Sequence, residues 1–232
     1  MKAKLTALQV SFIVIFLSFI FSTPSSASER CVYSDLKEVR IETSVGAVST
    51  VKVEYCGSDD GGRVSISMLT GKNRQNYKFI VENRAYSISI DSDIELKDDG
   101  GRGLGVANGG GRSGDGMWYW VFDRKKRLYR YIGEAPRLYR SKTKCGGIFS
   151  IESGSGDVQS MRYSYQVKND RLILLGAMGF IPIDDVYEIS LMTCTPDSRC
   201  NEVDRLKDVS PEKAQRYMNG TEDCDQERGP GN

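Results

Sequence analysis

A period-two alternation of apolar and polar residues recurs along the chain and constrains its fold class more than any other feature. Val51, Val53 and Tyr55 alternate with Lys52 and Glu54, and the same pattern returns in the segments 64–68, 86–91 and 161–168. Side chains of a β-strand alternate between two faces, so each segment predicts a strand with one buried face. Trp118–Phe122 and Leu172–Leu175 are apolar throughout and predict central strands that are buried on both faces.

The end of the chain predicts one hairpin and one helix. Ile189–Cys194 and the segment after Cys200 have the composition of two paired strands. A short helix near 210–219 is indicated by Ser210 as its cap, Pro211 in its first turn and Gly220 after its end. We therefore expect an all-β fold, an antiparallel sandwich, a barrel or an irregular small propeller-like assembly of sheets, with one short C-terminal helix.

The first residues are typical of a secretory signal peptide. Lys2 and Lys4 precede an apolar run from Leu8 to Phe21, and small residues follow as far as Ala27. This layout predicts cleavage after Ala27, and a retained membrane anchor is the alternative. We therefore expect a signal peptide at 1–27, a single all-β domain at 28–222 and a flexible tail at 223–232, in a periplasmic or secreted protein with no transmembrane segment after cleavage.

Six cysteines follow the predicted signal peptide. An even number of cysteines in an exported chain predicts disulfides, and six allow 15 connectivities. Cys194 and Cys200 flank a turn-forming sequence and are expected to pair with each other. For the others we expect Cys31 with Cys56 and Cys145 with Cys224. A metal site made of cysteines alone is the alternative, although the chain has no Cys-x-x-Cys pair.

The chain contains no histidine, which excludes several chemistries. Histidine is the usual general base near neutral pH and the commonest metal ligand. Ser-His-Asp triads, Cys-His dyads and histidine-bearing zinc sites are therefore excluded. Lys and Arg number 32 against 31 Asp and Glu, and this balance gives no reason to expect nucleic acid or an anionic membrane as a partner.

The balanced total hides a basic segment from Arg124 to Lys144. It holds nine basic residues and one acidic residue, Glu134, with Tyr129, Tyr131 and Tyr139 among them. In an exported protein this pattern favours an acidic protein or an anionic envelope polymer as partner. A solvated hairpin that binds nothing is the alternative. The predicted basic patch consists of Arg124, Lys125, Lys126, Arg127 and Arg130.

Three other segments carry weaker indications of chemistry. The glycine-rich stretch Gly100–Gly116 lacks a phosphate-binding motif and predicts a mobile loop between strands. The acidic stretch Asp91–Gly100 offers carboxylates that could bind Ca²⁺, but Leu96 and Lys97 occupy positions that a calcium loop gives to glycine and to an acidic ligand. We otherwise expect no metal and no cofactor. Glu152 and Asp157 could form a glycosidase-like carboxylate pair, although nothing in the sequence sets their separation.

Several features in order resemble a known bacterial group. They are the acidic glycine-rich segment, the aromatic strand, the basic hairpin, a strand ending in Ser-Gly, a tyrosine-rich strand and a short disulfide loop, in the segments 91–116, 118–123, 124–144, 148–154, 161–174 and 194–200. The chain is similar here to periplasmic immunity proteins and lysozyme inhibitors related to the inhibitor of invertebrate-type lysozyme. The likeness spans roughly Asp91 to Leu206 and rests on pattern more than on any rare motif.

The resemblance implies an exported protein that is not an enzyme and that inhibits a peptidoglycan hydrolase, or binds another exported protein. Such proteins insert a Ser-Gly-x-Tyr type loop into the cleft of the hydrolase. The matching residues are Ser153, Gly154, Ser155, Gly156 and Tyr163, with a longer gap before the tyrosine than the family motif has. The alternative function is an envelope-associated structural or adhesive module that binds anionic polymer through the basic hairpin.

Overall fold

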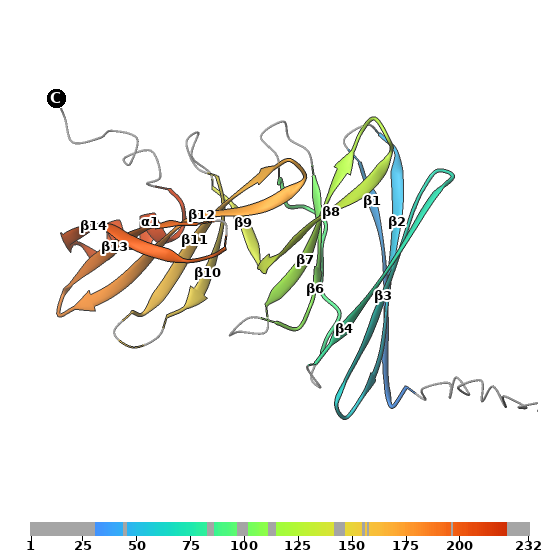
Figure 1. The fold of residues 1–232 in the computed structure, drawn as a ribbon, viewed down its shortest axis with the longest axis horizontal. Coiled ribbons are helices and arrows are strands. Elements are labelled where there is room, and N and C mark those ends of the chain that lie inside the picture. Colours follow the sequence, from blue (N-terminus) through green and yellow to red (C-terminus); the bar gives the residue numbers. More distant parts are fainter. Residues whose placement is uncertain are drawn as a thin grey trace, which may run out of the picture. The chain divides into compact units, whose positions relative to one another are not determined.

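The computed structural model describes residues 31–43, 46–82, 86–96, 102–110, 115–141, 147–154, 156, 158–195 and 197–221. This part of the chain forms three open antiparallel sheets and one short helix (Figure 1). The prediction of an all-β antiparallel fold with a short C-terminal helix is confirmed, and no sheet in the described ranges closes into a barrel. The predicted signal peptide, the tail at 223–232 and the pair Cys145–Cys224 lie outside the described residues.

The first sheet is a four-stranded meander of β1 (Tyr33–Glu42), β2 (Val48–Ser58), β3 (Gly61–Thr70) and β4 (Asn73–Val81). Its alternation works as predicted, because Val51, Val53 and Tyr55 are buried whereas Lys52 and Glu54 lie on the other face. The Cys31–Cys56 disulfide, predicted from the sequence, ties the residues before β1 to β2.

The second sheet has the order β5-β6-β7-β8, with β5 (Ile90–Asp91), β6 (Gly103–Ala107), β7 (Gly116–Asp123) and β8 (Leu128–Pro136). The central strand β7 is buried on both faces, as its apolar sequence predicts. Trp118, Trp120 and Phe122 join a core with the first sheet. Met117, Tyr119 and Val121, on the opposite face, join a second core that includes Leu138 and Ile148 of the third sheet.

The third sheet has the order β14-β13-β12-β11-β10-β9. Its strands are β9 (Leu138–Arg140), β10 (Ile148–Ser153), β11 (Ser160–Lys168), β12 (Arg171–Ile183), β13 (Val186–Cys194) and β14 (Cys200–Val209). The predicted hairpin of β13 and β14 is present, and the predicted Cys194–Cys200 disulfide closes its end. The alternative of a metal site built from cysteines is wrong for these two and for Cys31 and Cys56, since all four are in disulfides.

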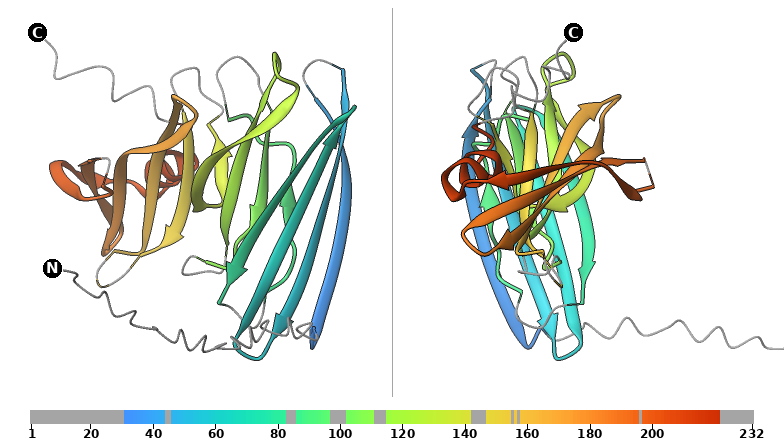
Figure 2. Two further views of the ribbon diagram at one scale, coloured as in Figure 1. Left: turned by 45° about the vertical axis from the view of Figure 1, so that its right-hand side comes forward. Right: turned by 90° about the vertical axis from the view of Figure 1, so that its left-hand side faces the viewer.

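The helix α1 (Pro211–Met218) covers a small third core on this sheet, where it contacts β13 (Figure 2). The Ser210 side chain accepts a hydrogen bond from the backbone N–H of Lys213, and Pro211 occupies the first turn. Gly220 follows the helix with a φ of 68°. The cap, the first turn and the end of the helix therefore all lie where the sequence places them.

The glycine-rich stretch was wrongly predicted as a loop, because its part from Gly103 to Ala107 is the buried strand β6. The glycines there allow close packing. A Cβ on Gly103 would lie 2.2 Å from the side chain of Leu96, and one on Gly105 would lie 2.9 Å from the ring of Tyr119. A glycine run therefore signals close approach of neighbouring groups here, not a connection in solvent.

Three further details differ from the strand predictions. In the segment 86–91 only Ile90 and Asp91 form a strand, although Tyr86 and Ile88 are buried as the alternation predicts. Leu172–Leu175 belongs to the inner strand β12 but is not buried on both faces, and Leu175 is 48% exposed. The reason is that β13 pairs with β12 only from Gly176 onward, so this end of β12 has β11 as its neighbour.

Arg162 is the clearest departure from the expected alternation. It was predicted on the polar face of β11 but is only 2% exposed. Its guanidinium carbon lies 4.4 Å from the centroid of the Phe149 ring, and its Nη1 lies 3.8 Å from the sulfur of Met178. Stacking over an aromatic face offsets part of the cost of burying this cation.

Candidate functional site

The predicted basic patch lies at the turn between β7 and β8. Residues 124–127 form this turn, and all four side chains, from Arg124 to Arg127, are exposed. Asp123 organises the turn, because its Oδ1 accepts hydrogen bonds from the backbone N–H groups of Lys125 and Lys126 at 2.9 and 3.0 Å. Arg127 has a positive φ of 53°, which closes the turn. Four consecutive cations are thus presented on a short connection whose backbone is held in place.

Arg130 belongs to the predicted basic patch, but two ion pairs neutralise its positive charge. Its guanidinium forms ion pairs with Asp123 and with Asp170, which lies in the turn between β11 and β12. The bond from the backbone N–H of Lys126, with help from Arg130, holds the pKa of Asp123 below its ordinary value. Arg130 therefore joins the second and third sheets, and its charge is neutralised where it stands.

A second basic turn lies beside the first. The β3–β4 connection carries Lys72, and Arg74 follows at the start of β4; both are exposed. This connection lies at the same end of its sheet as the β7–β8 turn (Figure 1). Asn73 joins the two turns, since its Nδ2 lies 3.3 Å from the carbonyl oxygen of Lys126 and 3.2 Å from that of Arg127. We call the exposed cations at and beside these two turns the basic tip surface: Lys72, Arg74, Arg124, Lys125, Lys126 and Arg127.

The basic segment of the sequence is therefore not one patch. Strand β8 leads away from the turn, so Arg137 and Arg140 follow its far end, where Arg137 faces Asp91 at 3.9 Å. Lys142 and Lys144 lie outside the described residues. Sequence reasoning missed Lys72 and Arg74, because they are separated from Arg124 by about fifty residues of chain. The turn-forming Gly71 between two strand patterns was the available signal.

The candidate inhibitory residues are only partly brought together. Ser153 ends β10, and the backbone N–H of Gly154 donates to the carbonyl oxygen of Gln159 at 3.0 Å, which closes a hairpin turn. Gly156 lies in this turn with a φ of 64°, and Ser155 is outside the described residues. Tyr163 lies within β11, opposite Ser150 and Ala177, and so stands in the sheet instead of in the turn.

A hollow of about 380 Å³ lies beside this turn. It is lined mainly by uncharged polar side chains from the hairpin, β13 and α1, among them Gln159, Ser160, Tyr187 and Gln215. The Tyr187 hydroxyl donates to Oε1 of Gln159 at 2.9 Å. Glu152 also lines the hollow, but Asp157 lies outside the described residues, so the idea of a carboxylate pair stays a prediction.

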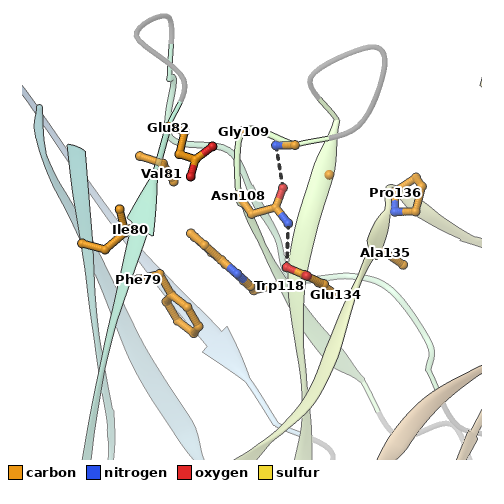
Figure 3. Close-up of a pocket in the computed structure, with 12 residues that line it drawn as sticks. Phe79, Ile80, Val81, Glu82, Asn108, Gly109, Trp118, Glu134, Ala135 and Pro136 are labelled. Atoms are coloured by element: carbon orange, nitrogen blue, oxygen red, sulfur yellow. Dashed lines mark hydrogen bonds between the residues drawn. The ribbon is translucent and has the colours of Figure 1, made fainter. Parts of the chain in front are cut away.

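The structure also contains a cleft that the sequence did not predict. It measures about 1050 Å³ and lies between the end of β4 and the end of β8 (Figure 3). Phe79 stacks on Trp118 at its base, with ring centroids 4.1 Å apart. Glu82 and Glu134 stand on opposite walls, and Nδ2 of Asn108 donates to Oε2 of Glu134 at 3.3 Å. Sequence reasoning missed this cleft because three distant segments build it.

At the opposite end of the same two strands, side chains close the gap. The amide of Gln75 accepts from the backbone N–H of Tyr129 at 2.8 Å and donates to its carbonyl oxygen at 2.7 Å. The Gln75 amide thus makes the two hydrogen bonds with the backbone of Tyr129 that a residue of a paired antiparallel strand would make. The Tyr77 hydroxyl also donates to the carbonyl oxygen of Tyr129, at 3.3 Å. Side-chain hydrogen bonds therefore join β4 and β8 near the β3–β4 and β7–β8 turns, and the two strands separate toward the cleft.

The described residues contain no cluster of three or more cysteine and acidic side chains that could hold a metal ion. In the segment considered for Ca²⁺, Asp91 and Asp93 lie 3.9 and 3.8 Å from arginine nitrogens, and the residues from Lys97 to Gly100 are outside the described ranges. Within the described ranges, no helix is long and apolar enough to span a membrane. The disulfides are compatible with an exported protein.

Comparisons with protein-family models, with curated proteins and with solved structures found no match for this chain. The resemblance to the lysozyme-inhibitor group is therefore still an expectation drawn from its sequence pattern.

Proposed function

We propose that this chain is an exported, periplasmic binding protein without enzymatic activity, which attaches to an anionic polymer of the cell envelope through the basic tip surface. The observation that carries the proposal is the joining of two basic turns by Asn73. Five exposed cations lie on these two connections, and a sixth, Arg74, lies at the start of β4. Cations that are gathered on one face attract a polyanion more strongly than the same charges spread over a protein.

The geometry of the two turns supports binding of a polymer over binding of a single small anion. The six cations extend over two hairpins instead of converging in a pocket. Their long side chains can each meet a separate negative group of a repeating chain. Asp123 and Asn73 fix the backbone of the turns, which lowers the entropy lost when the polymer binds.

The proposal is tested with immobilised polyphosphate as the probe, in a salt series, using the protein that begins at residue 28. We expect binding at low salt that weakens steadily as salt is added. The variant Lys125→Glu/Lys126→Glu should lower the association rate by about tenfold or more at low salt. The matched control Lys78→Glu/Lys207→Glu makes the same change of charge at exposed positions on β4 and β14. Equal effects of the two variants, or no binding at low salt, would reject the proposal.

A second candidate function is inhibition of a peptidoglycan hydrolase by the β10–β11 turn. The observation that favours it is the construction of the turn, since a Cβ on Gly154 would lie 2.0 Å from the carbonyl oxygen of Val158. The turn is therefore narrow and tightly closed, as a segment that enters a cleft must be.

This candidate is tested with a muramidase assay at micromolar protein. Gly156 has a positive φ and open space around its Cβ position, so Gly156→Asn adds bulk at the tip without a clash. Gly46→Asn is the matched control, at a glycine of similar φ and equally open surroundings in the β1–β2 turn. We expect inhibition that Gly156→Asn weakens and Gly46→Asn does not. Absence of inhibition by the unchanged protein rules this candidate out.

A further inference from the structure

We propose that the cleft between β4 and β8 binds an extended segment of another protein, which adds to β4 as a fifth strand and carries basic side chains at alternate positions. This site is separate from the basic tip surface. Its partner carries positive charge, whereas the partner proposed for the basic tip surface is an anionic polymer. The site does not depend on the proposed function.

The edge of β4 provides the backbone for such a strand. β4 is the last strand of the first sheet and pairs with β3 on one side only. An edge strand presents backbone N–H and C=O groups that a further strand can pair with. Near the β3–β4 and β7–β8 turns, the amide of Gln75 fills the space between β4 and β8. From Phe79 to Glu82 the edge opens into the cleft, so the position for an added strand is at this end.

The base of the cleft suits apolar side chains. Phe79 comes from β4 and Trp118 from β7, and their stacked rings form an aromatic base in Figure 3. Trp118 is only 4% exposed, so the base is already packed and its shape is set before a ligand arrives. Ile80, whose side chain lies on the other face of β4 from Phe79, is 76% exposed, the highest value among the large apolar residues of the described chain. A partner strand that covers Ile80 removes this apolar surface from water.

The walls of the cleft suit positive charge. Among the described residues that line it, Glu82 and Glu134 are the charged ones, and both are acidic. They stand on opposite walls, above the aromatic base (Figure 3). Successive side chains of a strand point in opposite directions. A segment that alternates apolar residues with Lys or Arg can therefore direct one set toward the rings and the other toward the carboxylates.

The size of the cleft agrees with a peptide ligand. Its volume of about 1050 Å³ lies just above the range of roughly 300–1,000 Å³ for small-molecule sites. Several residues of extended chain fit such a space. Backbone pairing supplies affinity in this mode of recognition, and the side-chain pockets supply selectivity.

The test uses a fluorescein-labelled hexapeptide of alternating valine and lysine and measures fluorescence anisotropy and backbone amide shifts. We expect saturable binding, with the largest shifts at residues 79–82. The double variant Glu82→Gln/Glu134→Gln should weaken binding by about tenfold or more, because it removes both charges that face the lysines. The matched control Glu38→Gln/Glu212→Gln removes two exposed carboxylates elsewhere and should leave the affinity unchanged.

Two further peptides separate strand addition from general charge attraction. The same hexapeptide with alternate amides N-methylated keeps its charge but cannot pair with a strand, and it should bind far more weakly. A valine–glutamate hexapeptide should not bind. Equal binding of the N-methylated peptide, shifts outside the cleft, or an unchanged affinity in Glu82→Gln/Glu134→Gln would overturn the inference. Lys125→Glu/Lys126→Glu should still bind the valine–lysine peptide, so the outcome is distinguishable from that of the polyphosphate experiment.

Discussion

The first two sheets and the third sheet are stabilised in different ways. Between the first two sheets lies one large core to which seven strands contribute, with Trp120 at its centre and fully buried. The third sheet has its own small core of six buried residues, which β12, β13, the end of β14 and the helix α1 supply. Much of β14 is exposed, and the Cys194–Cys200 disulfide closes its hairpin.

Buried apolar residues are therefore distributed unevenly along this chain. The first two sheets depend on residues that meet across two layers, whereas the end of the third sheet depends on hairpin pairing, a capped helix and a short covalent loop. Regions with fewer buried contacts open at lower free energy. We therefore expect the β13–β14–α1 region to open before the first two sheets. Each of the following predictions tests this comparison.

Trp120→Ala should have the largest effect on the free energy of unfolding. Its side chain is fully buried and contacts the rings of Tyr77 and Tyr131. Such a truncation costs about 3–5 kcal/mol. Urea unfolding followed by circular dichroism measures this loss. Leu36→Ala, at an exposed position on the outer face of the first sheet, should change stability little, and a similar loss in both variants would contradict the assignment of the core.

Tyr119→Phe should have the next largest effect, since it removes a contact between the second and third sheets. The Tyr119 hydroxyl accepts from the backbone N–H of Leu138 at 2.7 Å and is buried. Loss of this oxygen leaves the N–H of Leu138 unsatisfied, at a cost of about 1–3 kcal/mol. Both tryptophans of the chain lie in β7, so their fluorescence reports the first two sheets. In the variant we expect the unfolding transition followed by fluorescence to differ from the one followed by circular dichroism. Coincident transitions would show that Tyr119 does not join the second and third sheets.

Ser210→Ala should act locally, on the helix and the core beneath it. The substitution removes the cap that accepts the backbone N–H of Lys213 and should cost about 1 kcal/mol. Hydrogen exchange should become faster in α1 and β13, while rates in β2 and β3 stay unchanged. Ser87→Ala is the control, at an exposed serine outside any helix. Faster exchange throughout the molecule would mean that the two regions unfold together.

Local sequence signals predicted many of the elements, with β6 as the main exception, but not the sites that several elements build. The strand alternation, the Ser210 cap and the Cys194–Cys200 turn act between neighbours in sequence, so they can be recognised from the sequence itself. The burial of Arg162 depends on Phe149 in another strand, and the bond from Asn73 depends on a turn about fifty residues away. The cleft combines the ends of β4 and β8 with residues near Gly109, which no local pattern relates. Four of the six cations of the basic tip surface were found from the sequence, because they are consecutive.

The smallest expected effect concerns the partly buried joint between the second and third sheets, where Arg130 links Asp123 to Asp170. The backbone N–H of Lys126 and the Arg130 guanidinium lower the pKa of Asp123 from its ordinary 3.8. A lowered folded-state pKa gives stability that is complete above about pH 4 and is lost as pH falls through the folded value. Asp123→Asn should therefore be less stable than the unchanged protein at pH 7.

The gap between Asp123→Asn and the unchanged protein should begin to close as the pH falls below about 3.8, and it should vanish only below the lowered pKa, where the native carboxylate is protonated. Urea unfolding at several pH values between neutral and strongly acidic measures this gap. Asp59→Asn, which removes an exposed carboxylate from the β2–β3 turn, serves as the control for net charge. If the joint couples the two regions, Asp123→Asn should also increase hydrogen exchange in the β11–β12 turn at neutral pH. A gap that widens in acid would show that Asp123 does not act through its charge, and the coupling of the sheets would then rest on Tyr119 and the apolar residues around it.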